Sequence, residues 1–353
     1  METRNIFVDT EAFYRENLRF DGPVLSQLAT LGQANALNIL YTPIVYQEVL
    51  SHNKIMSLEL KNSISSMMRM THYLHNDVPA NLLSIANESL ETDFEKIGKA
   101  RFDNFLHQAN ATLLPINAIS AQELADLYFL GRPPFGHKKK KNEFPDAISL
   151  VGLHQWADTN KQSVFVVSHD KDMKGFCDEI ENLISLDHLT EVLDLYNRAT
   201  KPMAETVHVY LHRNHEVAVE SIGQIFSDFS FSYEDLAESY ADNISVESGE
   251  ITEIDVVEID DESAVVAITL NLKFTADVYG EDMSNAIWDK EDGHYYNVEY
   301  FTENLSFEKT FVSTVDLVIQ TDDEPDTEPE IIIDRVTFND DYEIALNSDD
   351  IRV

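Results

Sequence analysis

The chain has few of the residues and motifs on which several common functions depend. Its 353 residues include one cysteine, Cys177, which excludes an intramolecular disulfide and a cysteine-based zinc site. No long apolar run is present and the mean hydropathy is -0.26, so the sequence predicts no transmembrane helix. The chain begins with Met1-Glu2-Thr3-Arg4 and enters a predicted strand without an apolar signal segment. We expect a cytoplasmic protein that does not act at a membrane.

Two glycine-rich phosphate-binding motifs are also missing. The sequence contains neither GxGxxG nor GxxxxGK[ST], so nothing in it supports a dinucleotide-binding or P-loop protein. Cys177 lies in the apolar phase of a predicted helix with Met173, Phe176 and Ile180. We therefore expect a buried, inert thiol rather than a nucleophile.

Positive charge is scarce and unevenly distributed. The chain has 25 Lys and Arg against 64 Asp and Glu, a net charge of -39. Residues 1–200 hold 18 basic and 26 acidic residues, a net of -8, and residues 201–353 hold 7 and 38, a net of -31. This division predicts two domains with different roles, 1–200 and 201–353.

Strand and helix patterns alternate in the first of these domains. Helical patterns separate short hydrophobic strands expected at 5–9, 37–41, 112–116, 164–168 and 182–186. Such crossovers predict a parallel sheet with helices on both faces, a Rossmann-like α/β/α sandwich. After a helix expected over 204–226, period-two alternation predicts a mainly antiparallel β domain of α+β type, built as a sandwich or an open barrel-like meander.

Four acids follow or adjoin these strands and helices: Asp9, Glu48, Asp146 and Asp170. Each alone has an ordinary explanation as a turn residue, a helix cap or the rim of an apolar stripe. Together they are expected at one edge of the parallel sheet, where the carboxyl ends of all strands meet. Carboxylate oxygens suit hard divalent cations such as Mg²⁺ and Mn²⁺, so the sequence predicts a metal-dependent phosphodiesterase.

The first 200 residues resemble a PIN-domain nuclease. The matching segments, in order, are Ile6-Phe7-Val8-Asp9-Thr10, Thr42-Pro43-Ile44-Val45-Tyr46-Gln47-Glu48-Val49, Phe144-Pro145-Asp146-Ala147 and Val166-Val167-Ser168-His169-Asp170-Lys171-Asp172. The long insert between Glu48 and Asp146 resembles the larger bacterial members that carry a C-terminal β-rich extension. The resemblance implies a Rossmann-like PIN domain and a metal-dependent endoribonuclease, with toxin-like or phage-defence action as a family-based expectation.

The resemblance also implies the residue roles. Asp9, Glu48, Asp146 and Asp170 are expected to bind Mg²⁺ or Mn²⁺ and to be catalytic, with Asp172 as a reserve metal ligand. Ser168 is a candidate for binding a substrate phosphate, with a strand-end serine of no special role as the alternative. Arg132, Lys138, Lys139, Lys140 and Lys141 form the one dense basic segment and directly precede the Asp146 helix. We expect them to contact a nucleic-acid backbone without reading its sequence.

Alternatives remain at this level. The substrate could be DNA, as in a flap-type nuclease, although RNA is favoured. The protein could also be a non-catalytic PIN-like scaffold whose acidic domain binds a basic partner protein. That domain could instead occupy the chain's own basic loop or mediate self-association, and its charge makes direct nucleic-acid binding unfavourable.

Overall fold

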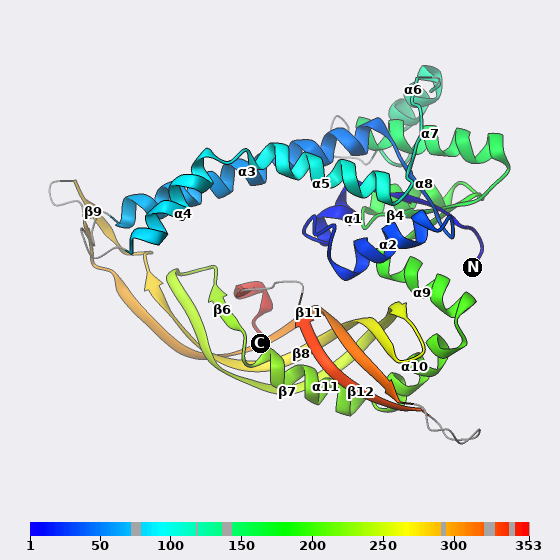
Figure 1. The fold of residues 1–353 in the computed structure, drawn as a ribbon. Coiled ribbons are helices and arrows are strands. Elements are labelled where there is room, and N and C mark those ends of the chain that lie inside the picture. The colour runs from blue at the N-terminus through cyan, green and yellow to red at the C-terminus, as the bar shows by residue number, and fades with distance from the viewer. Residues whose placement is uncertain are drawn as a thin grey trace. The chain divides into compact units, whose positions relative to one another are not determined.

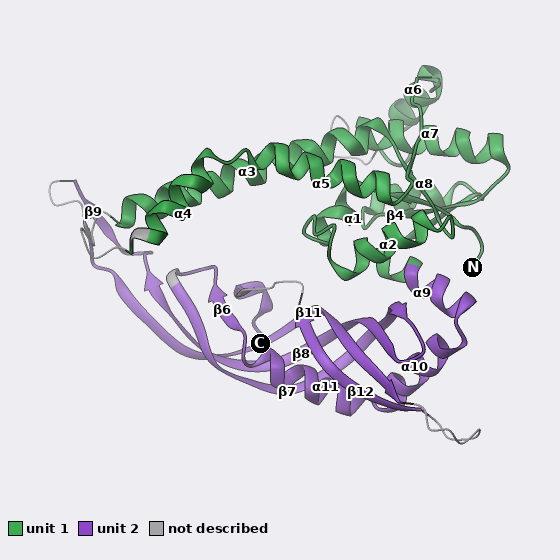
Figure 2. Ribbon diagram, viewed as in Figure 1, with its two compact units in different colours: residues 1–192 green, residues 193–353 purple. Residues whose placement is uncertain are grey.

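A computed structural model describes residues 1–71, 79–117, 119–135, 143–290, 294–320, 329–338 and 343–352 (Figure 1). The chain divides into two compact units, residues 1–192 and 193–353 (Figure 2). The division falls inside helix α9 (Leu189–Thr200), whereas the charge distribution suggests a boundary at the end of that helix.

The first unit contains a five-stranded parallel sheet. Its strands are β1 (Asn5–Val8), β2 (Asn38–Tyr41), β3 (Thr112–Leu113), β4 (Val164–Val167) and β5 (Leu183–Leu186). Their order is β3-β2-β1-β4-β5, and every pairing is parallel. All four residues of β1 and of β4 are buried, as expected of strands covered on both faces. The predicted parallel sheet is confirmed.

Helices connect and flank these strands. They are α1 (Thr10–Arg15), α2 (Pro23–Gln33), α3 (Pro43–Thr71), α4 (Ala80–Glu91), α5 (Phe94–Gln108), α6 (Ala121–Leu130), α7 (Phe144–Asn160) and α8 (Lys171–Asp178). Phe13 of α1 makes edge contacts with Phe102 and Phe105 of α5, with ring centroids 5.4 and 5.7 Å apart. Aromatic edge-to-face packing of this kind adds to the hydrophobic burial and holds α1 against α5.

The second unit is built on one six-stranded sheet in the order β12-β11-β8-β7-β6-β13. The strands are β6 (Ser230–Tyr233), β7 (Ala237–Ile259), β8 (Ser263–Asp282), β11 (Glu299–Gln320), β12 (Glu330–Phe338) and β13 (Glu343–Leu346), and a separate hairpin pairs β9 (Ile287–Asp289) with β10 (His294–Tyr296). All pairings are antiparallel except β6 with β13. The mainly antiparallel domain is confirmed. Strands β6, β7, β8, β11 and β12 neighbour one another in chain order, as in the meander that the sequence suggests. The alternative of a sandwich is wrong, since the described residues of this unit form no second sheet beyond the β9–β10 hairpin.

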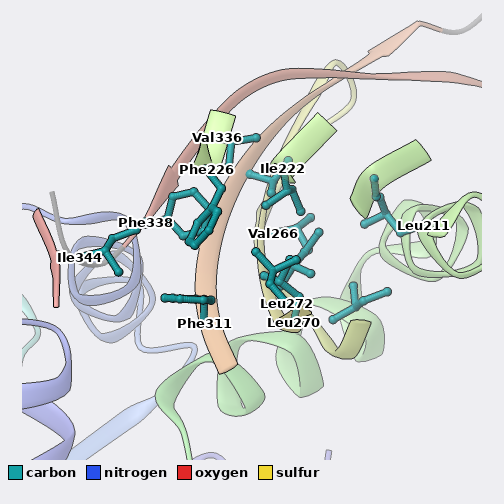
Figure 3. Packing of buried hydrophobic residues seen from close by; sticks show 14 of the residues in the cluster. Leu211, Ile222, Phe226, Val266, Leu270, Leu272, Phe311, Val336, Phe338 and Ile344 are labelled. Atoms are coloured by element: carbon teal, nitrogen blue, oxygen red, sulfur yellow. The ribbon is translucent and has the colours of Figure 1, made fainter. Parts of the chain in front are cut away.

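Helices rather than a second sheet cover the apolar face. The helix expected over 204–226 is two helices, α10 (Pro202–Arg213) and α11 (His215–Phe226), with Asn214 between them. Burial alternates along β8, so its apolar side chains face one side and its polar side chains the other. Phe226 of α11 packs against Phe274, Phe311 and Phe338 of the sheet, with ring centroids 4.9–5.6 Å apart (Figure 3 labels three of the four).

The break at Asn214 also separates three histidines that the sequence places on one helical face. His208 and His212 lie on α10 with ring centroids 4.8 Å apart, whereas His215 begins α11. Cys177 is buried, and burial raises the pKa of its thiol to about 12. The burial of Cys177 agrees with the inert thiol expected from the sequence. No described helix combines the length and apolar character needed to cross a membrane.

Two buried polar side chains tie α9 to the backbone of β7. The side-chain amide of Asn197 donates hydrogen bonds to the carbonyl oxygens of Val256 (2.7 Å) and Val257 (2.9 Å). The carboxylate of Asp194 accepts one from the Val256 N–H (3.1 Å). These contacts cap a segment of β7 that has no neighbouring strand on that side in the described residues.

We predict that Asn197→Leu destabilises the second unit by about 2–4 kcal/mol, because a buried acceptor left without a donor costs about 1–3 kcal/mol. Urea unfolding of the full chain measures the change. Gln224→Ala, at an exposed position of α11, is the matched control and should change stability by less than about 0.5 kcal/mol. Equal stability of Asn197→Leu and the unsubstituted protein would show that the contact contributes nothing.

Candidate active site

Two of the four acids follow neighbouring strands of the parallel sheet. Asp9 comes directly after β1, and Asp170 follows β4 by a few residues. The two strands pair with Val8 opposite Val167, and the Asp9 N–H donates to the Val167 carbonyl (3.1 Å). The chain leaves β1 and β4 in opposite directions along the sheet, and crevices for ligands form at such a switch point.

The other two acids come from helices that begin near this edge. Thr42 accepts a hydrogen bond from the Val45 N–H (3.3 Å), so its hydroxyl caps the start of α3. Glu48 lies in the second turn of this helix. Asp146 lies in the first turn of α7. A contact between the hydroxyls of Thr42 and Ser149 (2.9 Å) joins the starts of α3 and α7.

All four acids line one pocket of about 510 Å³. Its lining residues are Asp9, Thr10, Glu11, Tyr14, Glu48, Ser51, His52, Ile55, Asp146, Asp170 and Met173. Among these described residues His52 is the one basic side chain, so the carboxylates have little cationic compensation from the protein.

Hydroxyl groups orient two of the carboxylates. Ser168 donates to Asp9 Oδ2 (2.9 Å) and accepts from the Asp170 N–H (3.2 Å). Thr10 donates to Glu48 Oε2 (2.7 Å). Hydrogen bonds of this type at metal sites hold the ligands in position.

Burial and mutual repulsion disfavour ionisation in the pocket. Burial raises the pKa of Asp9 to about 6, with the charge of Glu48 adding to the rise and the Ser168 hydroxyl opposing it. Burial raises the pKa of Asp146 to about 7, and the charges of Asp9, Glu48 and Asp170 add to the rise. The negative charges of the four acids therefore repel one another, and each charge makes ionisation of its neighbours less favourable.

The donor chemistry fits a hard divalent cation. In the part of the chain that the structure describes, no three His, Cys, Asp or Glu side chains already form an arrangement that could hold a metal ion. The pocket is thus a group of repelling carboxylates rather than a closed coordination shell. A bound Mg²⁺ or Mn²⁺ would remove the repulsion and match the oxygen donors.

The remaining site residues of the sequence prediction lie in different places. Asp170 caps α8 through Oδ1, which accepts from the N–H groups of Asp172 (2.6 Å) and Met173 (3.4 Å), so Oδ2 is the oxygen available to a cation. Asp172 is not among the residues that line the pocket. The hydroxyl hydrogen of Ser168 is directed at Asp9 and not at the open pocket.

The basic segment is only partly described. Arg132 forms an ion pair with Glu179, at the end of α8 remote from the acids. Lys138, Lys139, Lys140 and Lys141 lie outside the described residues. Their predicted contact with substrate stays a prediction.

Two aromatic side chains of the pocket are additions to the sequence prediction. The rings of Tyr14 and His52 stack with centroids 3.9 Å apart, and the Tyr14 hydroxyl donates to the Glu48 carbonyl (3.0 Å). His52 lies one helical turn after Glu48, so helical periodicity from that acid is the signal that could have identified it. Burial raises the pKa of Tyr14 above its usual range, so the Tyr14 hydroxyl stays protonated and acts as a neutral hydrogen-bond donor.

A doubly covered parallel sheet with carboxylates at its switch point defines a Rossmann-like α/β domain with a candidate cation-binding site. Residues 6–173 match the family model described as PIN domain, and the first unit is accordingly a PIN domain, followed by a β-rich region. PIN domains are generally metal-dependent nucleases. No curated protein and no solved structure matches the chain.

We predict that Asp146→Asn stabilises the protein in EDTA, and more so at pH 8 than at pH 5.5. The pKa of Asp146 rises from 3.8 to about 7 on folding, so the folded state favours the neutral acid. The contribution of Asp146 to the free energy of unfolding is therefore greatest below pH 3.8 and is lost as the pH rises towards 7. Asparagine is neutral throughout. After allowance for solvent screening, the extra gain at pH 8 is on the order of 1 kcal/mol.

Thermal unfolding at the two pH values measures this difference. Glu59→Gln, at an exposed position of α3, removes the same charge without burial and is the control. A gain that is the same at both pH values, or the same as that of Glu59→Gln, contradicts the electrostatic account of the pocket.

Proposed function

We propose that the first unit is a divalent-cation-dependent endoribonuclease. The observation that carries the proposal is the convergence of Asp9, Glu48, Asp146 and Asp170 in one pocket at the carboxyl edge of the sheet. These residues would hold Mg²⁺ or Mn²⁺, which supplies Lewis-acid stabilisation of a phosphodiester and lowers the pKa of a bound water.

The protein's own residues have positioning roles in this proposal. Ser168 and Thr10 orient Asp9 and Glu48 through their hydroxyls. One acid of the set, such as Asp170, would orient the attacking water. The apolar side chains of Ile55 and Met173 also line the pocket.

The preference for RNA comes from the family resemblance, as does a toxin-like or phage-defence role. A DNase of flap type uses the same carboxylate chemistry, so the substrate panel below includes DNA. A non-catalytic scaffold would have no need for four carboxylates gathered against their mutual repulsion. Asp172 stays a reserve ligand, in the first turn of the helix that Asp170 caps.

We predict that Asp9→Asn and Asp146→Asn each slow RNA cleavage by more than about 100-fold, since loss of an outer-shell partner alone costs about 10–100-fold at metal sites. Purified full-length protein is incubated with labelled RNA, single-stranded DNA and duplex DNA in Mn²⁺, Mg²⁺ or EDTA. Cleavage should require the metal and be fastest with RNA. Asp178→Asn, at an exposed position at the end of α8, is the matched control and should retain activity.

Two outcomes contradict the proposal in different ways. Cleavage that persists in EDTA, or in both variants, excludes the carboxylate–metal site. A folded protein that binds Mn²⁺ at the pocket and cleaves none of the three substrates favours the scaffold. Faster cleavage of DNA than of RNA would support the carboxylate–metal mechanism but would identify DNA as the substrate.

We also predict that replacing Lys138 to Lys141 by alanine weakens RNA binding at low salt and flattens its salt dependence. Each lysine–phosphate ion pair that is removed reduces the slope of log K against log salt by about 0.7 for a single strand. Anisotropy titrations with the Asp146→Asn protein, across several salt concentrations, measure the slope. Lys54→Ala with Lys61→Ala, both on α3, is the control. An unchanged slope means that the basic segment does not contact the substrate.

A further inference from the structure

Three tyrosines lie together on the polar face of the six-stranded sheet. Tyr240 of β7 is directly opposite Tyr279 of β8. Tyr300 of β11 is opposite Glu281, two residues beyond Tyr279 and therefore on the same face. The neighbouring Val278 is fully buried in the core, so the tyrosines point away from it. Tyr240 is 52% exposed and Tyr300 82% exposed.

The rings form an ordered aromatic surface. Tyr240 and Tyr279 stack with centroids 4.9 Å apart and an interplanar angle of 16°. The β9–β10 hairpin joins β8 to β11 at the same end of the sheet (Figure 1) and carries another exposed aromatic pair, Trp288 and Tyr295, with centroids 4.7 Å apart. Exposed aromatic groups gathered in one region of a folded protein mark interaction sites.

Two carboxylates lie in the row beside the stacked tyrosines. Asp242 of β7 is directly opposite Asp277 of β8, and like charges at opposite positions of a sheet are destabilising. The oxygens of Asp277 accept hydrogen bonds from the side-chain amides of Asn243 (2.8 Å) and Asn304 (2.7 Å). These hydrogen bonds hold its pKa below the usual range, so the group is oriented and ionised at neutral pH. Glu281 adds a carboxylate on the other side of the tyrosines.

A cation would relieve the repulsion between Asp242 and Asp277. Its chemistry is indicated by what surrounds the pair, because aromatic faces attract cations and a planar guanidinium both stacks on rings and pairs with carboxylates. The ammonium of lysine is more strongly hydrated and cannot stack in this way. A nucleic acid is disfavoured by the net charge of -31 over residues 201–353.

We propose that Tyr240, Tyr279, Tyr300, Asp242, Asp277 and Glu281, here called the tyrosine–aspartate face, bind an arginine-rich segment of a partner protein. Side chains of one strand that share a face recur every second residue. An extended segment with arginine at alternate positions therefore presents guanidinium groups on one side, at the same spacing as the side chains on the polar face of the sheet. The polar face continues with Glu250 and Glu253 of β7, which extends the negative potential along the same direction.

The proposal does not depend on nuclease activity and is tested by binding alone. Full-length protein is titrated, at physiological ionic strength, into two fluorescent peptides of equal length and charge, one alternating arginine with serine and one alternating lysine with serine. We expect the arginine peptide to bind about tenfold more tightly, the effect of two exposed cation–π contacts. Tyr240→Ser with Tyr300→Ser should abolish this preference, and Tyr240→Phe with Tyr300→Phe should keep it.

The carboxylates are tested with a matched control. Asp242→Asn with Asp277→Asn should weaken the arginine peptide at least about tenfold, because ion pairs and stacking act on the same guanidinium. Glu250→Gln with Glu253→Gln removes the same charge farther along β7 and should weaken both peptides equally and by less. Thermal unfolding verifies that each variant is folded. Tyr240 and Tyr300 are exposed, so their replacement leaves the core intact.

Three outcomes overturn the proposal. Equal binding of the two peptides, with equal losses in both carboxylate variants, means that only a general acidic field attracts them. A peptide copying residues 136–143 that competes as strongly as the arginine peptide would make the chain's own lysine segment the occupant. Self-association that disappears in the Tyr→Ser variant would make a second copy the occupant.

Discussion

Repulsion among carboxylates at the carboxyl edge of β1 and β4 is the constraint on which the candidate site depends. A parallel sheet ends all its strands at one edge, so Asp9 and Asp170 meet there, and the starts of α3 and α7 bring Glu48 and Asp146 to the same pocket. Burial and mutual charge raise the pKa of Asp146 to about 7. The surrounding fold maintains this unfavourable arrangement through the hydroxyls of Ser168 and Thr10, a local cost in stability that a divalent cation would remove.

The second unit meets a different constraint, because one sheet must serve both a core and an open face. The period of two along β8 separates them: Phe274 and Val278 are buried, while Asp277 and Tyr279 lie on the other side. Helices α10 and α11 cover the apolar face, so no second sheet is required. The many acidic residues of this half are thereby concentrated on the polar face, where they contact solvent and potential partners. The aromatic rings among them add surfaces on which a cationic group can stack, which carboxylates alone do not provide.

Local signals predicted much of the first unit. Each buried strand of the parallel sheet was visible as a short apolar run, and Thr42-Pro43 marked the start of α3, because strand burial and N-capping depend on a few adjacent residues. The architecture of the second unit was harder to predict from the sequence. Alternation identified its strands, but it does not specify whether a helix or another sheet covers their apolar face. Asn214 divides α10 from α11 without a proline or glycine to mark the break, so the sequence suggested one helix.

The sequence by itself determined the PIN-type parallel sheet, the four acids that belong to it and the unequal charge of the two halves, since these depend on residue type and on spacing within single elements. Tertiary structure decided which side-chain atoms are occupied by hydrogen bonds or ion pairs and which remain open to a ligand. It directs the Ser168 hydroxyl at Asp9, engages Oδ1 of Asp170 in capping α8, pairs Arg132 with Glu179 and brings three tyrosines from three strands to one face. Those outcomes depend on hydrogen bonds and strand registers between residues far apart in the chain, which no local pattern encodes.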